Sequence, residues 1–366
     1  MKTVLFIAAA LGCVPCLAKE QGADERLRAI YTEEWKWRLE QFPGLEGVEK
    51  PVADRLPKVD AATQETRLRY WQDVLHKLDD VPRAQLSPEE QINYDVYRPE
   101  IENFVADQKF RDYEMPANSD SAFWTLYTPF REPMVGVQPS DQDKLKSEAA
   151  QVIREIVQPA YADLLKFFRD EYVPHTRATL AAEALPDGKT YYHQKIREFT
   201  TLDLSPDEIH QIGLSEVAKL HQQMVDAMRE SGFKGEFPAF TQFLRDDPQF
   251  YAKTPQELLN RAAWIAKVFD GKSSQYFGYL PRMRFAIKPV PADLAPFYTS
   301  GRGGPGIYLL NTYDLPHRPL YNLPALTLHE SAPGHAFQIA IALEHKNQPE
   351  FRRFDYISAY GEGWAL

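Results

Sequence analysis

Hydrophobic residues recur along most of the chain at intervals of three and four, the pattern of a helix with one buried face. Three of these segments begin with S-P-E-E at 87–90, S-P-D-E at 205–208 and T-P-Q-E at 254–257. Each motif supplies a hydroxyl N-cap, a proline at the first helical position and a glutamate at the third, so we predict a helix start at each. The predicted buried positions are Ile92, Val96, Tyr97, Ile101 and Val105 after the first motif and Ile209, Ile212, Val217, Leu220 and Met224 after the second.

The same periodicity predicts further helices. One over 27–39 ends before Pro43-Gly44, a second covers 68–78, and a long one over 152–168 tolerates or kinks at Pro159. Because helical periods occupy most of the chain, the predicted fold class is mainly α, a multi-helix body.

Two stretches depart from the helical period. R-M-R-F-A-I-K-P-V-P at 282–291 alternates between apolar and polar residues, and G-I-Y-L-L-N-T at 306–312 is a short run of strand-forming residues. We therefore predict a small β-sheet. The glycine-rich segment 297–306 is predicted to be a loop, and it is not a phosphate-binding loop because it lacks G-K-[ST]. Arg302 and Tyr308 are candidates for contact with a substrate.

The strongest candidate for chemistry is N-L-P-A-L-T-L-H-E-S-A-P-G-H-A-F-Q at 322–338, which contains His329, Glu330 and His335. Two neutral imidazoles can bind a zinc ion while an adjacent carboxylate accepts a proton from its water. The usual H-E-x-x-H spacing puts both histidines on one helix face, whereas here they lie six residues apart. Six residues rotate a straight helix by about 240°, so the two side chains would point apart.

Pro333 and Gly334 change this geometry. Pro333 cannot donate a backbone hydrogen bond, and Gly334 accepts dihedral angles that other residues resist. We therefore expect the helix to bulge and to return His335 to the side that His329 faces. Asn322 is the expected N-cap of this helix.

A third zinc ligand is expected near the end of the chain. Glu362 follows His335 by 27 residues and lies in a segment that we predict to be a neighbouring helix. Two histidines and one glutamate are a common ligand set of catalytic zinc. The sequence therefore predicts a Zn²⁺ site formed by His329, His335 and Glu362, with Glu330 as the general base.

These residues also carry a resemblance to a known family. H-E-S-A-P-G-H-A-F-Q and A-Y-G-E-G-W-A-L resemble the HExxPGHxxQ and EGWA signatures of the bacterial domain-of-unknown-function 885 family. The likeness extends to I-N-Y-D-V-Y, F-T-T-L-D-L-S-P-D-E-I-H-Q-I-G-L and G-P-G-I-Y-L-L-N-T, so it covers nearly all of the chain after the first twenty residues. The resemblance implies a helical, zincin-like, zinc-dependent hydrolase, distantly similar to the carboxypeptidase Taq and thimet oligopeptidase groups. Family members continue beyond the position of Leu366, so the chain is expected to be an N-terminal portion.

The predicted function is hydrolysis of a peptide substrate by zinc-activated water, as in a metallopeptidase. Two other interpretations stay open: a helical scaffold or binding protein that retains a relic of the metal site, and a zinc hydrolase of esters or non-peptide amides. The predicted strands have two interpretations as well. They either offer a free sheet edge to an extended peptide beside the metal helix or only cover the core.

Composition limits the partners. The net charge of −10 argues against a nucleic-acid backbone. No stretch of the mature chain is long and apolar enough to cross a membrane. There is no internal repeat, low-complexity tract or clear linker, so we expect residues 19–366 to form a single helical domain, within which 19–135 could form a sub-lobe.

Residues 1–18 have the pattern of a signal peptide, with a positive start, a short apolar run and a small-residue cleavage site. Cleavage after Ala18 would remove Cys13 and Cys16 and leave a mature chain without cysteine, which suits a periplasmic or secreted protein. An alternative interpretation takes A-L-G-C at 10–13 as a degenerate lipoprotein box that anchors the protein through a lipid on Cys13.

Overall fold

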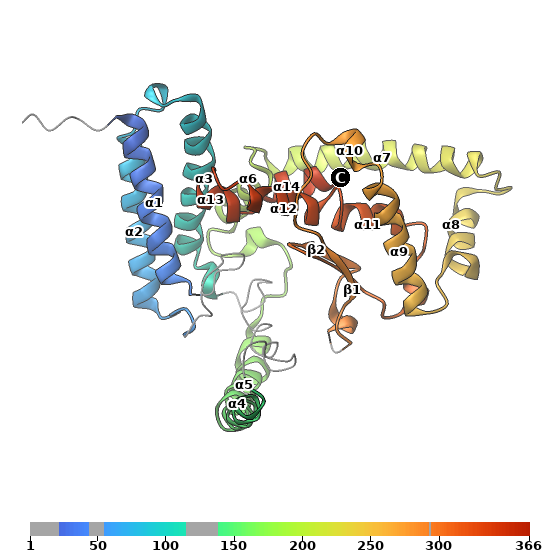
Figure 1. The fold of residues 1–366 in the computed structure, drawn as a ribbon, viewed down its shortest axis with the longest axis horizontal. Helices are drawn as coiled ribbons and strands as arrows, with labels where there is room; N and C mark the ends of the chain where they lie inside the picture. Colours follow the sequence, from blue (N-terminus) through green and yellow to red (C-terminus); the bar gives the residue numbers. More distant parts are fainter. Residues whose placement is uncertain (1–21, 44–54, 115–137, 293) are drawn as a thin grey trace, which may run out of the picture. The chain divides into compact units, whose positions relative to one another are not determined.

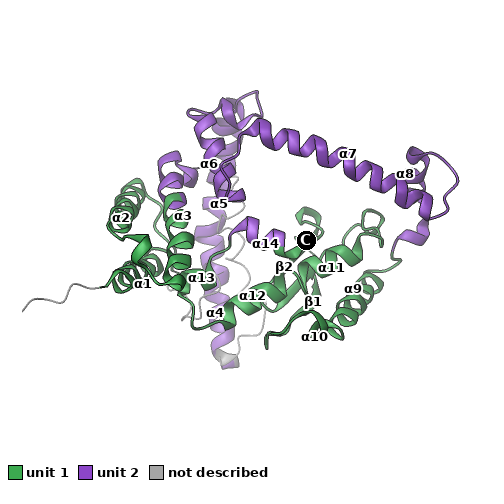
Figure 2. Ribbon diagram, turned by 90° about the horizontal axis from the view of Figure 1, so that it is seen from above, with its two compact units in different colours: residues 1–102, 252–356, 364–366 green, residues 103–251, 357–363 purple. Residues whose placement is uncertain are grey.

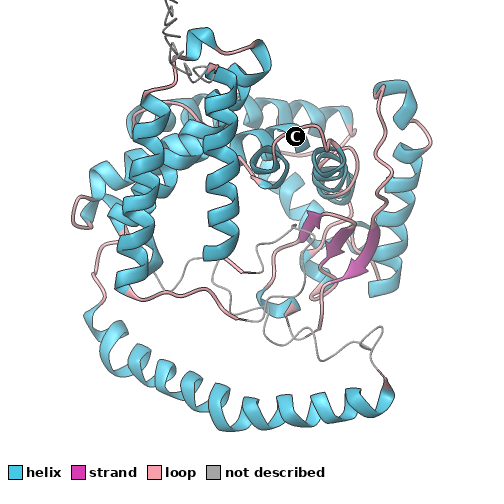
Figure 3. Ribbon diagram, turned by 60° about the vertical axis from the view of Figure 1, so that its left-hand side comes forward, coloured by secondary structure: helices cyan, strands magenta, loops and turns pink. Residues whose placement is uncertain are grey.

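The computed structural model describes residues 22–43, 55–114, 138–292 and 294–366. This part of the chain is mainly helical with one small three-stranded sheet (Figures 1 and 3), which confirms the predicted fold class. The signal-peptide and lipoprotein predictions at residues 1–18 lie outside the described residues. No helix in the described part of the chain has the length and apolar character that a membrane span requires.

Contacts divide the chain into two compact units, which Figure 2 colours separately. The first unit contains Met1–Glu102, Ala252–Tyr356 and Trp364–Leu366, and the second contains Asn103–Tyr251 and Ile357–Gly363. The sequence predicts one helical domain over 19–366, whereas the contacts in the structure group the residues into two units.

Three helices form a bundle in the first unit, where the sequence predicts helices (Figure 1). They are α1 (Ala23–Gln41), α2 (Ala61–Asp79) and α3 (Pro88–Phe110), of which α3 continues into the second unit. The short helix α13 (Glu350–Phe354) adds Phe351 to their core. The ring centroid of Phe351 lies 5.2 Å from that of Tyr31 and 4.9 Å from that of Tyr97.

The bundle core contains a charged network as well as apolar side chains. Glu34 accepts hydrogen bonds from the Arg38 guanidinium at 2.9 and 2.7 Å, from Trp71 Nε1 at 3.0 Å and from the Tyr97 hydroxyl at 3.2 Å. Arg38 also pairs with Glu100, and complete burial raises the pKa of the Glu100 carboxyl to about 8. The buried Arg38 guanidinium therefore has a charged partner in Glu34, the condition under which proteins tolerate such burial.

The predicted buried face of α3 is wrong at its start. Ile92 is 51% exposed, whereas Glu90 and Asn93 on either side of it are buried. Glu90 accepts hydrogen bonds from Arg28 Nε at 2.7 Å and from Asn93 Nδ2 at 3.1 Å. These two polar residues occupy the inward positions of the first turns, so the helical period places Ile92 on the solvent side.

The segment with the candidate metal ligands lies in the other part of the first unit. Its helices are α9 (Pro255–Asp270), α10 (Ser273–Tyr276), α11 (Leu323–Glu330) and α12 (His335–Glu344). Helix α9 begins at the predicted T-P-Q-E motif, where the Thr254 hydroxyl accepts a hydrogen bond from the Glu257 backbone N–H at 3.1 Å. Leu258 from α9, Leu310 from the sheet and Leu323 from α11 are buried together in one apolar cluster.

The sheet has the strand order β1–β3–β2. Strand β1 (Ala286–Pro289) pairs parallel with β3 (Ile307–Leu310), and β2 (Gly301–Gly304) pairs antiparallel with β3. Strands β1 and β3 confirm the predicted sheet, but β2 forms in the glycine-rich segment that the sequence predicts to be a loop. Glycine has a low strand propensity, so the local sequence gives no signal for this strand. Strand β2 packs against α11 and α12, beside the candidate metal ligands.

The second unit contains α4 (Pro139–Val152), α5 (Gln158–Phe167), α6 (Gly188–Thr200), α7 (Pro206–Glu230) and α8 (Phe237–Asp246), and most of α14 (Ser358–Ala365). A π-helical turn at Ile153–Val157 joins α4 to α5, so the helical chain continues through Pro159. The wider π turn accommodates a residue that cannot donate a backbone hydrogen bond.

Short 3₁₀ helices occur in both units, at Arg83–Gln85, Asp112–Glu114, Val173–His175, Ala182–Ala184, Pro248–Phe250, Ala295–Phe297 and Leu315–His317.

Helix α7 begins with the predicted capping box. The Ser205 hydroxyl accepts a hydrogen bond from the Glu208 N–H at 3.2 Å, and the Glu208 carboxylate accepts one from the Ser205 N–H at 2.8 Å. The predicted burial of its apolar stripe is wrong, because Ile212, Val217 and Leu220 are 53%, 66% and 51% exposed. Helical periodicity predicts which residues share a face but not what covers that face.

Candidate metal centre

The segment that carries both histidines forms two helices, not the single bulged helix that we expected. Helix α11 ends at Glu330 and α12 begins at His335, and the turn between them is closed by a hydrogen bond from the Gly334 N–H to the Leu328 carbonyl at 3.0 Å. A Cβ on Gly334 would lie 1.7 Å from the His329 carbonyl oxygen. Only glycine therefore allows the backbone to return so close to α11.

This turn brings His329 and His335 together. Their ring centroids lie 4.6 Å apart, with the ring planes at 86°. One ligand atom from each of His329, Glu330 and His335 lies within 4.8 Å of the others, and His335 is only 8% exposed. A tetrahedral zinc at about 2.1 Å from each nitrogen needs ligand atoms roughly 3.4 Å apart. The donor types and their spacing therefore fit a zinc ion after a small adjustment of the side chains.

Strand β2 holds the carboxylate of Glu330. The Gly303 N–H donates a hydrogen bond to Glu330 Oε2 at 2.6 Å. A Cβ on Gly303 would lie 1.9 Å from the Glu330 carbonyl oxygen and 2.9 Å from His335 Cβ. The glycine thus permits β2 to pack directly against the ends of α11 and α12. The same contact orients the carboxylate beside the two histidines.

The far end of α12 is fixed by a second carboxylate. Glu344 accepts hydrogen bonds from the Arg282 N–H at 3.0 Å, the Met283 N–H at 2.7 Å and the Tyr279 hydroxyl at 2.8 Å. These bonds, with that from the Arg282 N–H as the largest contribution, lower the pKa of Glu344. Helix α12 is therefore anchored at both ends, because His335 packs at its start and Glu344 binds the segment before β1 at its end.

Tyr308 does not occupy the position predicted for a substrate-binding residue. Its side chain is 0% exposed and belongs to the core beneath α11, and burial raises the pKa of its phenol. The Thr327 hydroxyl, which is also buried, interacts with this phenol. Tyr308 thus supports the metal helix, and a substrate cannot reach it in this conformation.

Arg302 lies on the opposite face of the sheet from the metal ligands. The glycines on either side of it face Glu330, since a Cβ on Gly301 would lie 3.6 Å from Glu330 Cγ and one on Gly303 would lie 1.9 Å from the Glu330 carbonyl oxygen. Successive residues of a strand point to opposite faces, so the exposed Arg302 side chain points away from the histidines. The prediction that it binds substrate beside the metal is therefore corrected. The error arises because a loop prediction does not fix the face on which a side chain lies.

The structure adds Tyr356 to the site, a residue that the sequence patterns did not identify. Its ring centroid lies 6.2 Å from that of His335, and the side chain is 46% exposed. Tyr356 lies in the irregular segment after α13, where no periodicity marks a functional position. Only its nearness in sequence to the E-G-W-A motif could have drawn attention to it.

The third predicted ligand, Glu362, is not one of the three grouped residues. It is exposed and lies on α14, in the stretch Ile357–Gly363 that belongs to the second unit. Two residues later the chain is back in the first unit, where Trp364 Nε1 donates a hydrogen bond to the Pro333 carbonyl at 2.7 Å. The assignment of Glu362 as a ligand stays a prediction.

Comparison with solved structures identifies two proteins with a similar fold. A protein described as a "putative lipoprotein" from Colwellia psychrerythraea is 18% identical, with a TM-score of 0.73 over 94% of this chain and 77% of that one. A second, described as a "putative lipoprotein of unknown function" from Shewanella oneidensis, is 14% identical, with a TM-score of 0.57 over 94% and 76% of the two chains. No curated protein matches the chain.

Comparison with family models supports the resemblance that the motifs carry. The model described as "Bacterial protein of unknown function (DUF885)" matches residues 99–366, which include α11, α12 and α14. Because this match covers more than half of the chain, the protein belongs to the DUF885 family of bacterial proteins.

Proposed function

We propose that the protein is a zinc-dependent hydrolase that cleaves peptide bonds. The observation that carries this proposal is the convergence of His329, Glu330 and His335, whose ligand atoms lie within 4.8 Å of one another. The two imidazoles are ligands of zinc in many catalytic sites, and Glu330 lies beside them, where such sites place the general base. His329 and His335 would hold the ion, and Glu362 is proposed as the third ligand from the sequence pattern.

Zinc in such a site supplies a Lewis acid that polarises a carbonyl and lowers the pKa of water. Glu330 then acts as the general base, accepting the proton of the attacking water and passing it to the leaving amine. The hydrogen bond from the Gly303 N–H to Oε2 supports this role, because it fixes one carboxylate oxygen and orients the other.

The edge of β2 offers a place for an extended peptide. The Asn311 N–H donates to the Ser300 carbonyl, so the alternation of an antiparallel ladder turns the backbone groups of Gly301 and Gly303 away from β3. The Gly303 N–H is already bound to the Glu330 carboxylate, so an added peptide would pair with the backbone of Gly301 and run past that carboxylate. Addition of a strand to a sheet edge is a common mode of peptide binding, in which backbone hydrogen bonds provide affinity.

Tyr356 is the proposed donor to the developing oxyanion. It presents a phenol beside His335 and is accessible to solvent. Hydrolysis of an acyl group produces negative charge on the carbonyl oxygen, and a preorganised hydroxyl donor stabilises that charge. Replacement of Tyr356 by phenylalanine should lower kcat without loss of metal.

We further propose that the protein is exported to the bacterial envelope. The N-terminal pattern at 1–18 supports export, and both similar solved structures are described as putative lipoproteins, which favours a lipid anchor on Cys13 over release after Ala18. Mass spectrometry of protein from the native host distinguishes the two. A diacylglyceryl-modified Cys13 supports the anchor, and an unmodified chain that begins at Lys19 contradicts it.

Digestion of a peptide library tests the function most directly. The purified protein is incubated with the library, with and without a chelator, and parallel reactions contain a panel of esters and non-peptide amides. Chelator-sensitive cleavage of peptides supports the proposal. Cleavage confined to the ester or amide panel would instead identify a different acyl substrate, and metal binding without any turnover would identify a scaffold with a relic site.

A further inference from the structure

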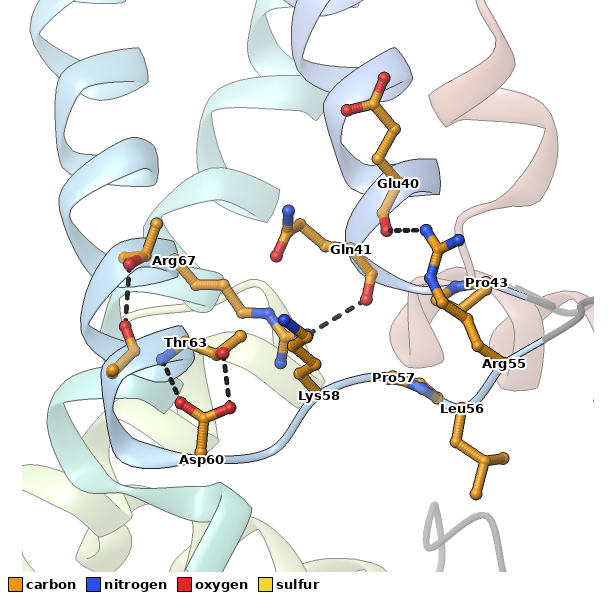
Figure 4. A pocket seen from close by; sticks show the side chains of 12 residues that line it. Glu40, Gln41, Pro43, Arg55, Leu56, Pro57, Lys58, Asp60, Thr63 and Arg67 are labelled. Carbon is orange, nitrogen blue, oxygen red and sulfur yellow. Dashed lines mark hydrogen bonds between the residues drawn. The ribbon is translucent and has the colours of Figure 1, made fainter.

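A cavity of about 780 Å³ lies at the end of the helical bundle, in the first unit and apart from the metal ligands. Figure 4 shows its walls, which come from the C-terminal turn of α1, the segment before α2 and the first turns of α2. The volume falls in the range of small-molecule sites. Its lining residues are Glu40, Gln41, Pro43, Arg55, Leu56, Pro57, Lys58, Asp60, Ala62, Thr63, Thr66 and Arg67.

Arg67 is the unusual member of this lining. It is 3% exposed, yet it forms no ion pair with a carboxylate among the described residues. Its Nη1 donates to Gln64 Oε1 at 3.2 Å and its Nη2 to the Gln41 carbonyl at 3.1 Å, while Nε has no partner. Burial lowers the pKa of the Arg67 guanidinium. Buried arginines are normally paired with an acid, and Arg67 is not, so its guanidinium can bind an anion from solution.

Asp60, the acid whose charge acts on Arg67, is already engaged. Asp60 is the N-cap of α2, and its carboxylate accepts hydrogen bonds from the Thr63 N–H at 3.0 Å and the Thr63 hydroxyl at 2.8 Å. The dashed lines in Figure 4 mark both bonds, together with that from Arg67 to Gln41. Asp60 therefore neutralises the helix terminus and does not pair with Arg67.

The charges of the cavity select the kind of anion. Among the described residues of the lining, Arg55, Lys58 and Arg67 are cationic and Glu40 and Asp60 are anionic, so their formal charges sum to +1. A single carboxylate balances this charge, whereas a phosphate dianion would leave an excess of negative charge. The apolar part of the lining, which includes Leu56 and Pro57, suits an organic body and not a bare inorganic ion.

We propose that this cavity binds a small organic monocarboxylate, whose carboxylate pairs with Arg67 and whose apolar part packs against Leu56 and Pro57. The guanidinium can pair with both oxygens of a carboxylate, which is the geometry that arginine favours. Lys58, which is exposed at the cavity rim, attracts the anion to the opening. This inference does not depend on the proposed hydrolase activity, because no residue of the metal centre takes part.

A purely structural role for Arg67 is the competing explanation. The guanidinium carbon lies 4.2 Å from the centroid of the Phe42 ring, and its bond to the Gln41 carbonyl caps the end of α1. Both contacts stabilise the junction of α1 and α2. Neither supplies a negative charge, so an experiment that measures anion binding separates the two roles.

Titration calorimetry at low salt, with benzoate as the probe, tests the proposal. We expect saturable binding with a dissociation constant on the order of 1 mM, as a small ligand with one ion pair allows. Benzamide has the same shape without the charge and should bind at least tenfold more weakly. Inorganic phosphate should also bind more weakly than benzoate. No saturation by benzoate, or equal affinity for benzamide, would overturn the proposal.

Two variants and a matched control locate the site. Arg67→Gln should weaken benzoate binding at least tenfold, whereas Arg69→Gln on the same helix should leave it unchanged, because Arg69 is exposed and pairs with Glu65 at 2.9 Å. Lys58→Gln, at an exposed position, should weaken binding about threefold, and it provides the readout if Arg67→Gln does not fold. Benzoate affinity that is the same in Lys58→Gln, in any folded Arg67→Gln protein and in the wild type would contradict the assignment.

Discussion

Ionisable side chains gather in the bundle core and at the candidate metal centre of the first unit, and the two groups differ in what balances their charge. In the bundle, Glu34 and Glu100 surround Arg38, a cation that the chain itself provides. In the metal centre, His329, His335 and Glu330 converge, and all three are residue types that donate electron pairs to a metal. The bundle network therefore contains its own cation. The group formed by His329, Glu330 and His335 contains none and has the composition of a site that binds a metal ion. We expect substitutions in the first to affect stability and those in the second to affect function.

The largest expected effect is on turnover in the metal centre. Glu330→Gln removes the proton acceptor and keeps the size of the side chain, so we expect kcat to fall by about 10²- to 10⁴-fold. The unfolding free energy should change by less than about 1 kcal/mol, because the amide oxygen can still accept the Gly303 N–H. Steady-state kinetics and denaturant unfolding measure the two quantities. A fully active Glu330→Gln protein would contradict the expectation that substitutions in this group affect function and not stability.

The bundle should show the reverse behaviour. Arg38→Met removes the cation and leaves Glu34 and Glu100 buried without a charged partner, so we expect the protein to lose about 3–5 kcal/mol of stability. Zinc content of the folded protein should stay the same. Arg69→Met is the control on the surface of the same bundle, and its exposed pair with Glu65 should contribute less than about 1 kcal/mol. Equal stability losses in the two variants would show that the buried network has no special role.

Substitutions of Gly303 and Gly304 test whether β2 needs a glycine for close packing or for the flexibility of its backbone. A Cβ on Gly303 would meet the Glu330 carbonyl oxygen at 1.9 Å, whereas a Cβ on Gly304 would meet only Ile307 Cγ2 at 3.9 Å. Gly303→Ala should therefore displace β2 from the metal centre and lower kcat/KM by on the order of 10²-fold. Gly304→Ala on the same strand should remain within about twofold of the wild type. Similar kinetics for the two variants would contradict the role given to β2.

The smallest expected effect is a pH dependence of stability. Burial raises the pKa of Glu100 to about 8 in the folded protein, above its usual value of about 4.5. The folded state therefore binds the proton more tightly, and the stability that this provides is lost as the pH rises from about 5 to 8. We expect the unfolding free energy to fall as the pH rises over this interval. Glu100→Gln should flatten the dependence, and an unchanged slope in that variant would assign the effect to another group.

Local sequence signals predicted most of the helices and the convergence of His329, Glu330 and His335, because both depend on residues close together in the chain. The capping box of Ser205 and Glu208 forms as its motif indicates. The H-E…P-G-H motif identified the three residues that converge, although their helix breaks where a bulge was expected. The backbone between the two helices is the reason, since Ser331 and Gly334 have non-helical ψ angles of −102° and −134°.

The errors arose where the outcome depends on distant residues. Strand β2 exists because Gly301 and Gly303 fit against α11 and α12, a packing requirement that no local propensity records. That missed strand also explains the wrong placement of Arg302, since only a strand fixes which face its side chain takes. Two other errors have the same cause: Val217 was predicted to be buried and is exposed, and Tyr308 was predicted to be accessible and is buried. A sequence pattern does not tell what covers a given face.

The zinc content of four proteins tests the central claim most directly. Atomic absorption of the wild type should give about one zinc per chain, and Glu330→Gln should retain it because this residue is assigned as the base. His329→Ala and His335→Ala should each lose the metal while thermal unfolding shows that they remain folded. Zinc absent from the wild type, or present equally in both histidine variants, would contradict the assignment of this group as a catalytic metal centre.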